Sequence, residues 1–138
     1  MTSKSAAILA FLLVILTAGL ARPEHEVYYR YTVLGYVKDG AGQLRQGVQV
    51  ELVREKTGFS YLGQTDPSGL FVIVARLGDE AVGEQLRLRA GEHATTLIAR
   101  FDPKDHARER GTRVDLVGAR WLETPTTFAA TLKRFIAQ

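Results

Sequence analysis

The chain has 138 residues, with 18 lysines and arginines against 15 acidic residues, a net charge of +3 at pH 7, and no cysteine. This length suits one domain, and so small a charge does not favour nucleic-acid binding, which needs a strong basic excess. The lack of cysteine excludes thiolate nucleophiles, Cys-ligated zinc, iron–sulfur clusters and disulfides, so an apolar core has to hold the fold together.

The first part of the chain, residues 1–21, has the three-part layout of a secretory signal peptide. Lys4 supplies a positive charge, residues 6–16 are apolar without interruption, and Gly19 and Ala21 are the small residues expected before a cut at Arg22. The apolar stretch is shorter than the roughly 20 residues that a spanning helix needs. We therefore predict export to the periplasm or out of the cell. An uncleaved N-terminal anchor is the alternative, and membrane contact is expected only in that case.

A short lead-in over residues 22–30 is followed by a region, residues 31–118, in which apolar and polar residues alternate. This alternation predicts strands at residues 31–37, 47–54, 59–65, 70–77, 85–90, 93–101 and 112–117. Seven strands separated by frequent turn signals favour an all-β, Ig-like sandwich over an α/β fold.

Two turns between these strands have a clear chemistry. Asp66-Pro67-Ser68-Gly69 suits a type I turn, because Asp, Pro and Gly each occupy a preferred position. The apolar runs on either side of it predict a hairpin. Gly91-Glu92 suits a two-residue type II′ loop. That loop sets a register in which Ala90 lies opposite His93, Leu88 opposite Thr95 and Leu86 opposite Leu97.

The strand at residues 70–77 is apolar on both faces. It is therefore either a central strand that is covered on both sides, or a strand that presents one face to something else. A C-terminal tail at residues 119–138 changes to a helical period, with Thr124 and Pro125 suited to a helix start. The tail carries one apolar stripe, formed by Phe128, Leu132, Phe135 and Ile136.

This amphipathic stripe is the best candidate for partner binding. The helix either folds back on its own sandwich, for which the second face of the strand at 70–77 is a natural place, or lies in a groove of another protein. Three arginines add a second candidate, because they can share the outer face of one hairpin as an anionic docking stripe. We expect a solvated sheet face there instead. These residues are Arg87, Arg89 and Arg100.

Four short motifs follow one another within residues 32–101: Gly35-x-Val37-x-Asp39, Gly42-x-Leu44, Gly47-x-x-Val50-x-Leu52 and Thr65-Asp66-x-x-Gly69-x-Phe71. Together they resemble the carboxypeptidase regulatory-like domain, a member of the transthyretin-like (prealbumin-like) β-sandwiches. The resemblance implies seven strands, Greek-key connections and a mostly non-enzymatic role in stiffening, tethering or docking proteins and sometimes sugars at cell surfaces.

One enzyme of that fold, hydroxyisourate hydrolase, ends in a Tyr-Arg-Gly-Ser motif, whereas this chain ends in Phe135-Ile136-Ala137-Gln138. Its activity is therefore not carried over. The three histidines have no second ligand at helical or strand spacing, so we expect surface residues at His25, His93 and His106.

The sequence thus predicts a non-catalytic accessory, structural or protein-docking module of the cell envelope, with no cofactor, metal site or catalytic residue. Its expected partner is another envelope or secreted protein, and no nucleic acid is expected. The alternative is a carrier for a small ligand or carbohydrate. A hydroxyisourate-hydrolase-like enzyme is the third reading.

Overall fold

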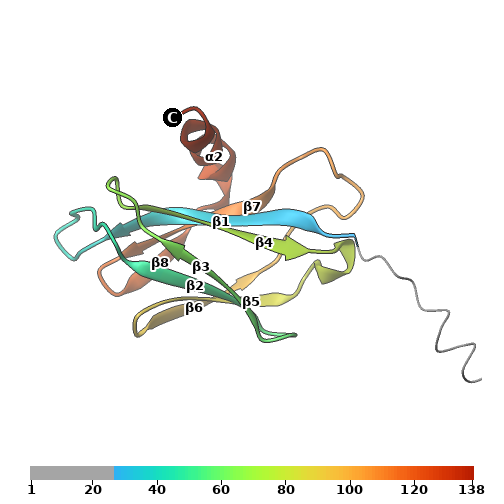
Figure 1. The fold of residues 1–138 in the computed structure, drawn as a ribbon, viewed down its shortest axis with the longest axis horizontal. Coiled ribbons are helices and arrows are strands. Elements are labelled where there is room, and N and C mark those ends of the chain that lie inside the picture. The colour runs from blue at the N-terminus through green and yellow to red at the C-terminus, as the bar shows by residue number, and fades with distance from the viewer. Residues whose placement is uncertain (1–26) are drawn as a thin grey trace, which may run out of the picture.

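The computed structural model describes residues 27–138, which form two facing four-stranded sheets and one α-helix (Figure 1). The predicted signal peptide lies outside the described residues. The first sheet contains, in spatial order, β4 (Leu70–Leu77), β1 (Tyr29–Lys38), β7 (Arg110–Val117) and β8 (Arg120–Glu123). The second contains β3 (Phe59–Gln64), β2 (Gln49–Arg54), β5 (Gln85–Ala90) and β6 (His93–Ile98). Two short 3-10 turns, η1 (Asp79–Ala81) and η2 (Pro125–Thr127), precede β5 and the helix α2 (Phe128–Ile136).

The core lies between the two sheets and is built by period-two alternation. In β4, the residues Phe71, Ile73, Ala75 and Leu77 are at most 1% exposed, and they meet the fully buried side chains of the second sheet, such as Leu52 and Leu88. The predicted all-β sandwich is confirmed in this coarse form. Within residues 27–138, no helix is long and apolar enough to cross a bilayer.

The predicted count of seven strands is wrong, because the structure has an eighth strand within the segment assigned to the tail. This strand, β8, pairs antiparallel with β7. Its Trp121 packs edge-on against Phe71, with ring centroids 6.3 Å apart, and donates its indole N–H to the carbonyl oxygen of His93 at 3.1 Å. Trp121 therefore bridges the two sheets. A strand of four residues is too short for its alternation to stand out in the sequence.

The turns were predicted correctly, but one of the hairpins was not. The predicted register of β5 and β6 is confirmed at all three pairs. In the turn at Asp66, the carboxylate accepts the backbone N–H groups of Ser68 and Leu70, and Gly69 has a φ of +78°. The flanking strands do not form the predicted hairpin, because β3 belongs to the second sheet and β4 to the first. The turn therefore carries the chain from one sheet to the other.

β4 is an edge strand and not a central one, so the second of the two predicted arrangements holds. One face of β4 packs in the core between the sheets, and its other face is presented to another element. That element is α2, which packs on part of the outer face of the first sheet (Figure 1). Phe128 and Leu132 pack on Leu34 of β1 and on Val72 of β4, which lie opposite each other in the ladder. The helix thus folds back on its own sandwich.

A partly buried polar contact secures the same helix. Arg113 of β7 donates through Nη1 to the hydroxyl of Thr131 at 3.0 Å, and its other nitrogens donate to both carboxylate oxygens of Asp115. Thr131 in turn donates to the carbonyl oxygen of Thr127 at 2.7 Å. Because Arg113 lies beside Leu34 in the parallel β1–β7 ladder, apolar and polar contacts to α2 form one continuous row.

Burial of Tyr31 makes the fold less stable at high pH. Burial raises the pKa of Tyr31 to about 12. In the unfolded chain a tyrosine ionises near pH 10, so the contribution of neutral Tyr31 is complete below about pH 10 and is lost as the pH rises to about 12. We expect the free energy of unfolding to fall by about 2–3 kcal/mol over this interval. Urea titrations at several pH values measure it, and Tyr31→Phe should remove this part of the decline; an unchanged decline in that variant would contradict the assignment.

Candidate functional site

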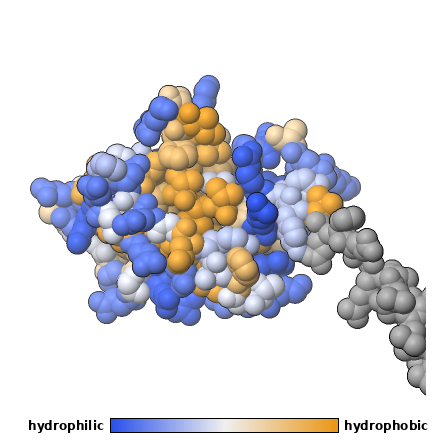
Figure 2. All heavy atoms as spheres, viewed as in Figure 1, coloured by the Kyte–Doolittle hydropathy of each residue, from blue (hydrophilic) through white to orange (hydrophobic). Residues whose placement is uncertain are grey.

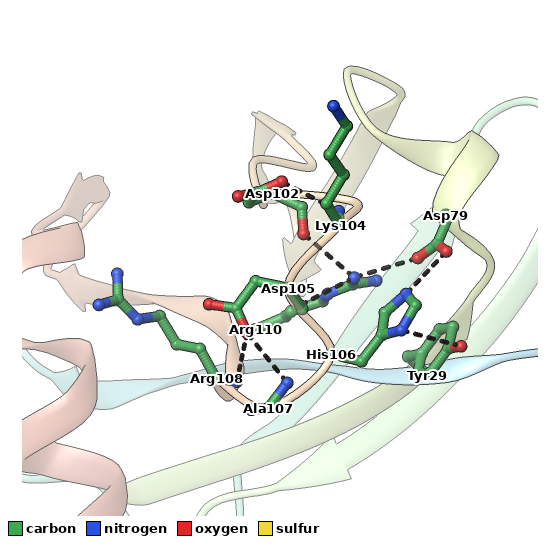
Figure 3. A network of polar contacts seen from close by, with 9 residues as sticks. All are labelled: Tyr29, Asp79, Asp102, Lys104, Asp105, His106, Ala107, Arg108 and Arg110. Atoms are coloured by element: carbon green, nitrogen blue, oxygen red, sulfur yellow. Dashed lines mark hydrogen bonds and ion pairs between the residues drawn. The ribbon is translucent and has the colours of Figure 1, made fainter.

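A polar cluster at one end of the sandwich joins the start of β1, the turn η1 and the loop between β6 and β7 (Figure 3). His106 donates through Nε2 to Asp79 Oδ2 at 2.8 Å, and its Nδ1 lies 3.5 Å from the Tyr29 hydroxyl. The rings of His106 and Tyr29 are stacked, with centroids 4.3 Å apart and an interplanar angle of 11°. Figure 3 shows His106 and Arg110 both turned toward Asp79.

Arg110 is the buried centre of this cluster, with only 5% of its side chain exposed. Its Nη2 lies 3.0 Å from Asp79 Oδ1 and donates to the carbonyl oxygens of Asp102 and Asp105 at 3.2 Å each. Its guanidinium carbon lies 4.2 Å from the ring centroid of Phe101 and 4.9 Å from that of Tyr29. Nη1 is buried without a hydrogen-bond partner within residues 27–138, and the two aromatic faces add cation–π contacts to the ion pair with Asp79.

These contacts make the cluster a clamp for the loop between β6 and β7. Desolvation acts to raise the pKa of Asp79, but the contacts with His106 and Arg110 outweigh it and lower that pKa below its ordinary value. The Asp79 carboxylate therefore stays charged down to a lower pH than usual. Both ring nitrogens of His106 lie beside groups of the cluster, Asp79 Oδ2 and the Tyr29 hydroxyl, and one face of the imidazole is stacked on Tyr29.

Arg110→Met tests the clamp, because it keeps the length of the side chain and removes both carbonyl hydrogen bonds, the ion pair and the cation–π contacts. We expect the free energy of unfolding to fall by about 2–3 kcal/mol. Amide exchange in the loop at residues 102–109 should also become faster. Both quantities are measured against Arg108→Met, an exposed neighbour for which we expect a change within about 0.5 kcal/mol. Equal losses in the two variants would contradict the clamp.

The three arginines proposed as a docking stripe are placed apart. Arg87 and Arg89 point outward from β5, and Arg89 pairs with Glu51 at 2.7 Å. Arg100 follows the end of β6 and lines a different region, a depression of about 800 Å³ beside α2 that also involves Arg108, Arg110 and Phe128. The structure therefore brings Arg100 next to the clamp and leaves the other two on the outer face of the second sheet.

A second depression, of about 650 Å³, lies between the two edge strands β3 and β4, and we call it the β3/β4 groove. It is lined by Tyr28, Arg54, Thr57, Phe59, Tyr61, Val74 and Arg76. Phe59 and Tyr61 lie opposite Arg54 and Leu52 in the ladder, so they occupy the inner side of the second sheet. Because β3 is at the edge, the first sheet does not cover Phe59, which is 61% exposed. Its ring is tilted by 56° against Tyr61, with centroids 5.0 Å apart.

Most polar groups of the β3/β4 groove already have partners within the chain. Arg54 donates through Nε and Nη2 to both carboxylate oxygens of Glu84, each at 2.7 Å, and this hydrogen bonding lowers the pKa of Glu84. The Thr57 hydroxyl accepts the N–H of Phe59, and the Tyr61 hydroxyl donates to the carbonyl oxygen of Arg76. Among the described residues the guanidinium of Arg76 has no ion pair, and no acidic residue lines the groove.

The groove continues into a wider apolar surface. Figure 2 shows apolar side chains gathered in a band that runs from α2 across β4 toward β3. Of the four helix residues predicted to bind a partner, Phe128 and Leu132 are buried against the chain's own first sheet, whereas Phe135 and Ile136 are 37% and 68% exposed. Val74 of β4 is 45% exposed. The predicted stripe is therefore divided between intramolecular packing and exposed surface.

Sequence reasoning missed both the clamp and the groove. His106 was expected to be a plain surface histidine, and no spacing in the sequence connects it with Asp79 or Arg110. Phe59 and Tyr61 alternate as core residues do, so only the position of β3 at the edge makes them candidates. The other two histidines are less informative, since His93 is the first residue of β6 and His25 lies outside the described residues.

No family model and no curated protein matches this chain. One solved structure that is similar to it is the dioxygenase domain of a dioxygenase carbohydrate-binding protein fusion from the cellulolytic bacterium Streptomyces sp. SirexAA-E. The TM-score is 0.47 and the sequence identity is 18%, over 70% of this chain and 83% of that chain. A likeness of this size carries no argument about the site of the present chain.

Proposed function

We propose that this protein is a non-catalytic docking module that is exported to the cell envelope and binds another envelope or secreted protein. The observation that carries the proposal is the β3/β4 groove with its apolar continuation over β4 and the exposed end of α2 (Figure 2). Contiguous apolar surface of this kind, rimmed by polar residues, marks interaction sites in soluble proteins.

The groups of the polar clamp support a binding role over a catalytic one. Asp79, His106 and Arg110 are engaged with one another and with backbone carbonyl oxygens, and Tyr29 and Phe101 cover the guanidinium. The clamp thereby holds the loop that leads into β7. In this proposal it stabilises the end of the sandwich and takes no part in chemistry.

The proposal includes a kinship with the carboxypeptidase regulatory-like domains and a Greek-key connection. It is supported by the return of β4 to lie beside β1 after the β2–β3 hairpin in the other sheet. Export rests on the layout of residues 1–21 in the sequence.

A small-ligand carrier is the second candidate, and the depression beside α2 favours it. Three arginines, three acidic residues and two aromatic rings line that depression, a mixture that suits a small polar ligand such as a sugar or sugar acid. They are Arg100, Arg108 and Arg110, Asp102, Asp105 and Glu109, and Phe101 and Phe128. Thermal unfolding with glucuronate separates the two candidates, because a ligand that binds only the folded state raises the midpoint. A carrier should show that shift, whereas a docking module should not.

Co-purification tests the proposed function. Tagged protein is recovered from the native envelope as wild type, as Phe59→Ser and as Leu122→Ser. Leu122 is the matched control, because it is 45% exposed on β8, at the opposite edge of the first sheet from β4. We expect a stoichiometric companion with the wild type and with Leu122→Ser, and its loss with Phe59→Ser. A protein that elutes alone in all three forms would contradict the proposal.

A further inference from the structure

Building on the proposed function, we propose that β3 is an acceptor edge for one extended strand of the partner, which places apolar side chains against Phe59 and Leu62 and a carboxylate against Arg76. The free edge of β3 is a row of backbone groups that pairs with β2 on one side only. Such an edge is a template for strand addition, in which main-chain hydrogen bonds supply affinity and side-chain pockets supply selectivity.

The apolar residues of β3 are exposed on both faces of the sheet. Phe59 lies on the inner side and Leu62 on the outer side, because they pair with Arg54 and Glu51, which alternate along β2, and each is 61% exposed. A helix laid across one face would contact only one of them. A strand added in the plane of the second sheet contacts both, because its own side chains alternate between the two faces.

The polar groups of the groove favour a protein segment over a sugar. A sugar needs free hydrogen-bonding groups around an aromatic face, but Arg54, Thr57 and Tyr61 already have partners in the chain. The tilted pair of Phe59 and Tyr61 forms a notch beside Val74 that suits one apolar side chain.

The charge of the groove specifies an acidic residue two positions from that anchor, on the same face of the added strand. Arg76 has no ion pair among the described residues, and Arg54 and Arg76 are the two charged residues that line the groove. A carboxylate on the partner strand would meet Arg76 without facing a like charge. A basic residue at the same place would be repelled.

Selection from a display library of random dodecapeptides tests this inference with the full-length protein as bait. Peptides are retained on wild type and on Leu122→Ser, and those that also bind Phe59→Ser are removed. We expect enrichment of sequences in which Asp or Glu stands two residues from an apolar anchor, because residues i and i+2 of a strand share a face. One such peptide is then titrated, and we expect Phe59→Ser and Leu62→Ser each to weaken binding by about tenfold or more, with Leu122→Ser unchanged.

Two further readouts separate strand addition from simple groove filling. Binding should slow amide exchange at alternate residues of Phe59–Gln64 by about tenfold, since only the amides on the free edge gain new hydrogen bonds. Arg76→Glu should reverse the preference toward lysine-containing versions of the peptide. Two kinds of result from the selection would overturn the inference: enrichment of basic or helical peptides, or the absence of any peptide that depends on Phe59. It would also be overturned by exchange protection outside β3, by pairing of β3 with a second copy of the chain, or by binding of a sugar at Phe59. In those cases, loss of the co-purifying companion in the Phe59→Ser variant would still support the proposed function.

Discussion

Gly35→Ala is expected to destabilise the fold by about 3–5 kcal/mol, a loss large enough to unfold a marginal domain. Gly35 lies in β1, where the strand passes close to β7, and a Cβ atom there would overlap the carbonyl oxygen of Val114. The obstacle is backbone and not a flexible side chain. β1 is paired on both sides, with β4 and β7, so it cannot move away without breaking one of the ladders.

Gly40→Ala is the matched control for this prediction. Gly40 lies in the turn that follows β1, and a Cβ atom there would meet nothing within 4 Å. We expect its free energy of unfolding to stay within about 0.5 kcal/mol of the wild type. Guanidinium titrations of both variants measure the difference. Similar midpoints for the two would mean that β1 and β7 do not approach as closely as described.

Phe71→Ala is expected to cost about 3–5 kcal/mol, because the ring is fully buried and its removal leaves a cavity. The ring also supports Trp121, which connects the two sheets. Phe59→Ala removes the same group from an exposed site, and we expect a change within about 1 kcal/mol. Denaturant titrations of the pair therefore separate a phenylalanine that stabilises the fold from one that is available for binding. A comparable loss for Phe59→Ala would remove it as a docking residue.

The features that the sequence predicts well are those decided by local chemistry. The loop at Gly91 and Glu92 is two residues long, so it determines the register of β5 and β6, and that register is confirmed. The turn at Asp66 was equally recognisable from its residues. Its local chemistry does not specify which sheet the next strand joins, and for that reason the predicted hairpin between β3 and β4 was wrong.

The features that could not be predicted depend on the order of strands in space. Phe59 and Leu52 look alike in an alternating pattern, yet one is exposed and the other buried, because β3 is at an edge and β2 is not. The clamp joins Asp79 to residues 27 and 31 positions away, His106 and Arg110, through a loop without sequence periodicity. Within the C-terminal stripe, only the packing of α2 on Leu34 decides which residues remain exposed.

Photo-crosslinking in living cells measures the central claim most directly. A photoreactive phenylalanine analogue is placed at Phe59 in one version of the protein and at Leu122 in another, and the cells are irradiated before lysis. The docking account predicts a covalent adduct with one other envelope protein from position 59, attached to an extended acidic and apolar segment, and none from position 122. The absence of any adduct at position 59, or the same adducts from both positions, would contradict it.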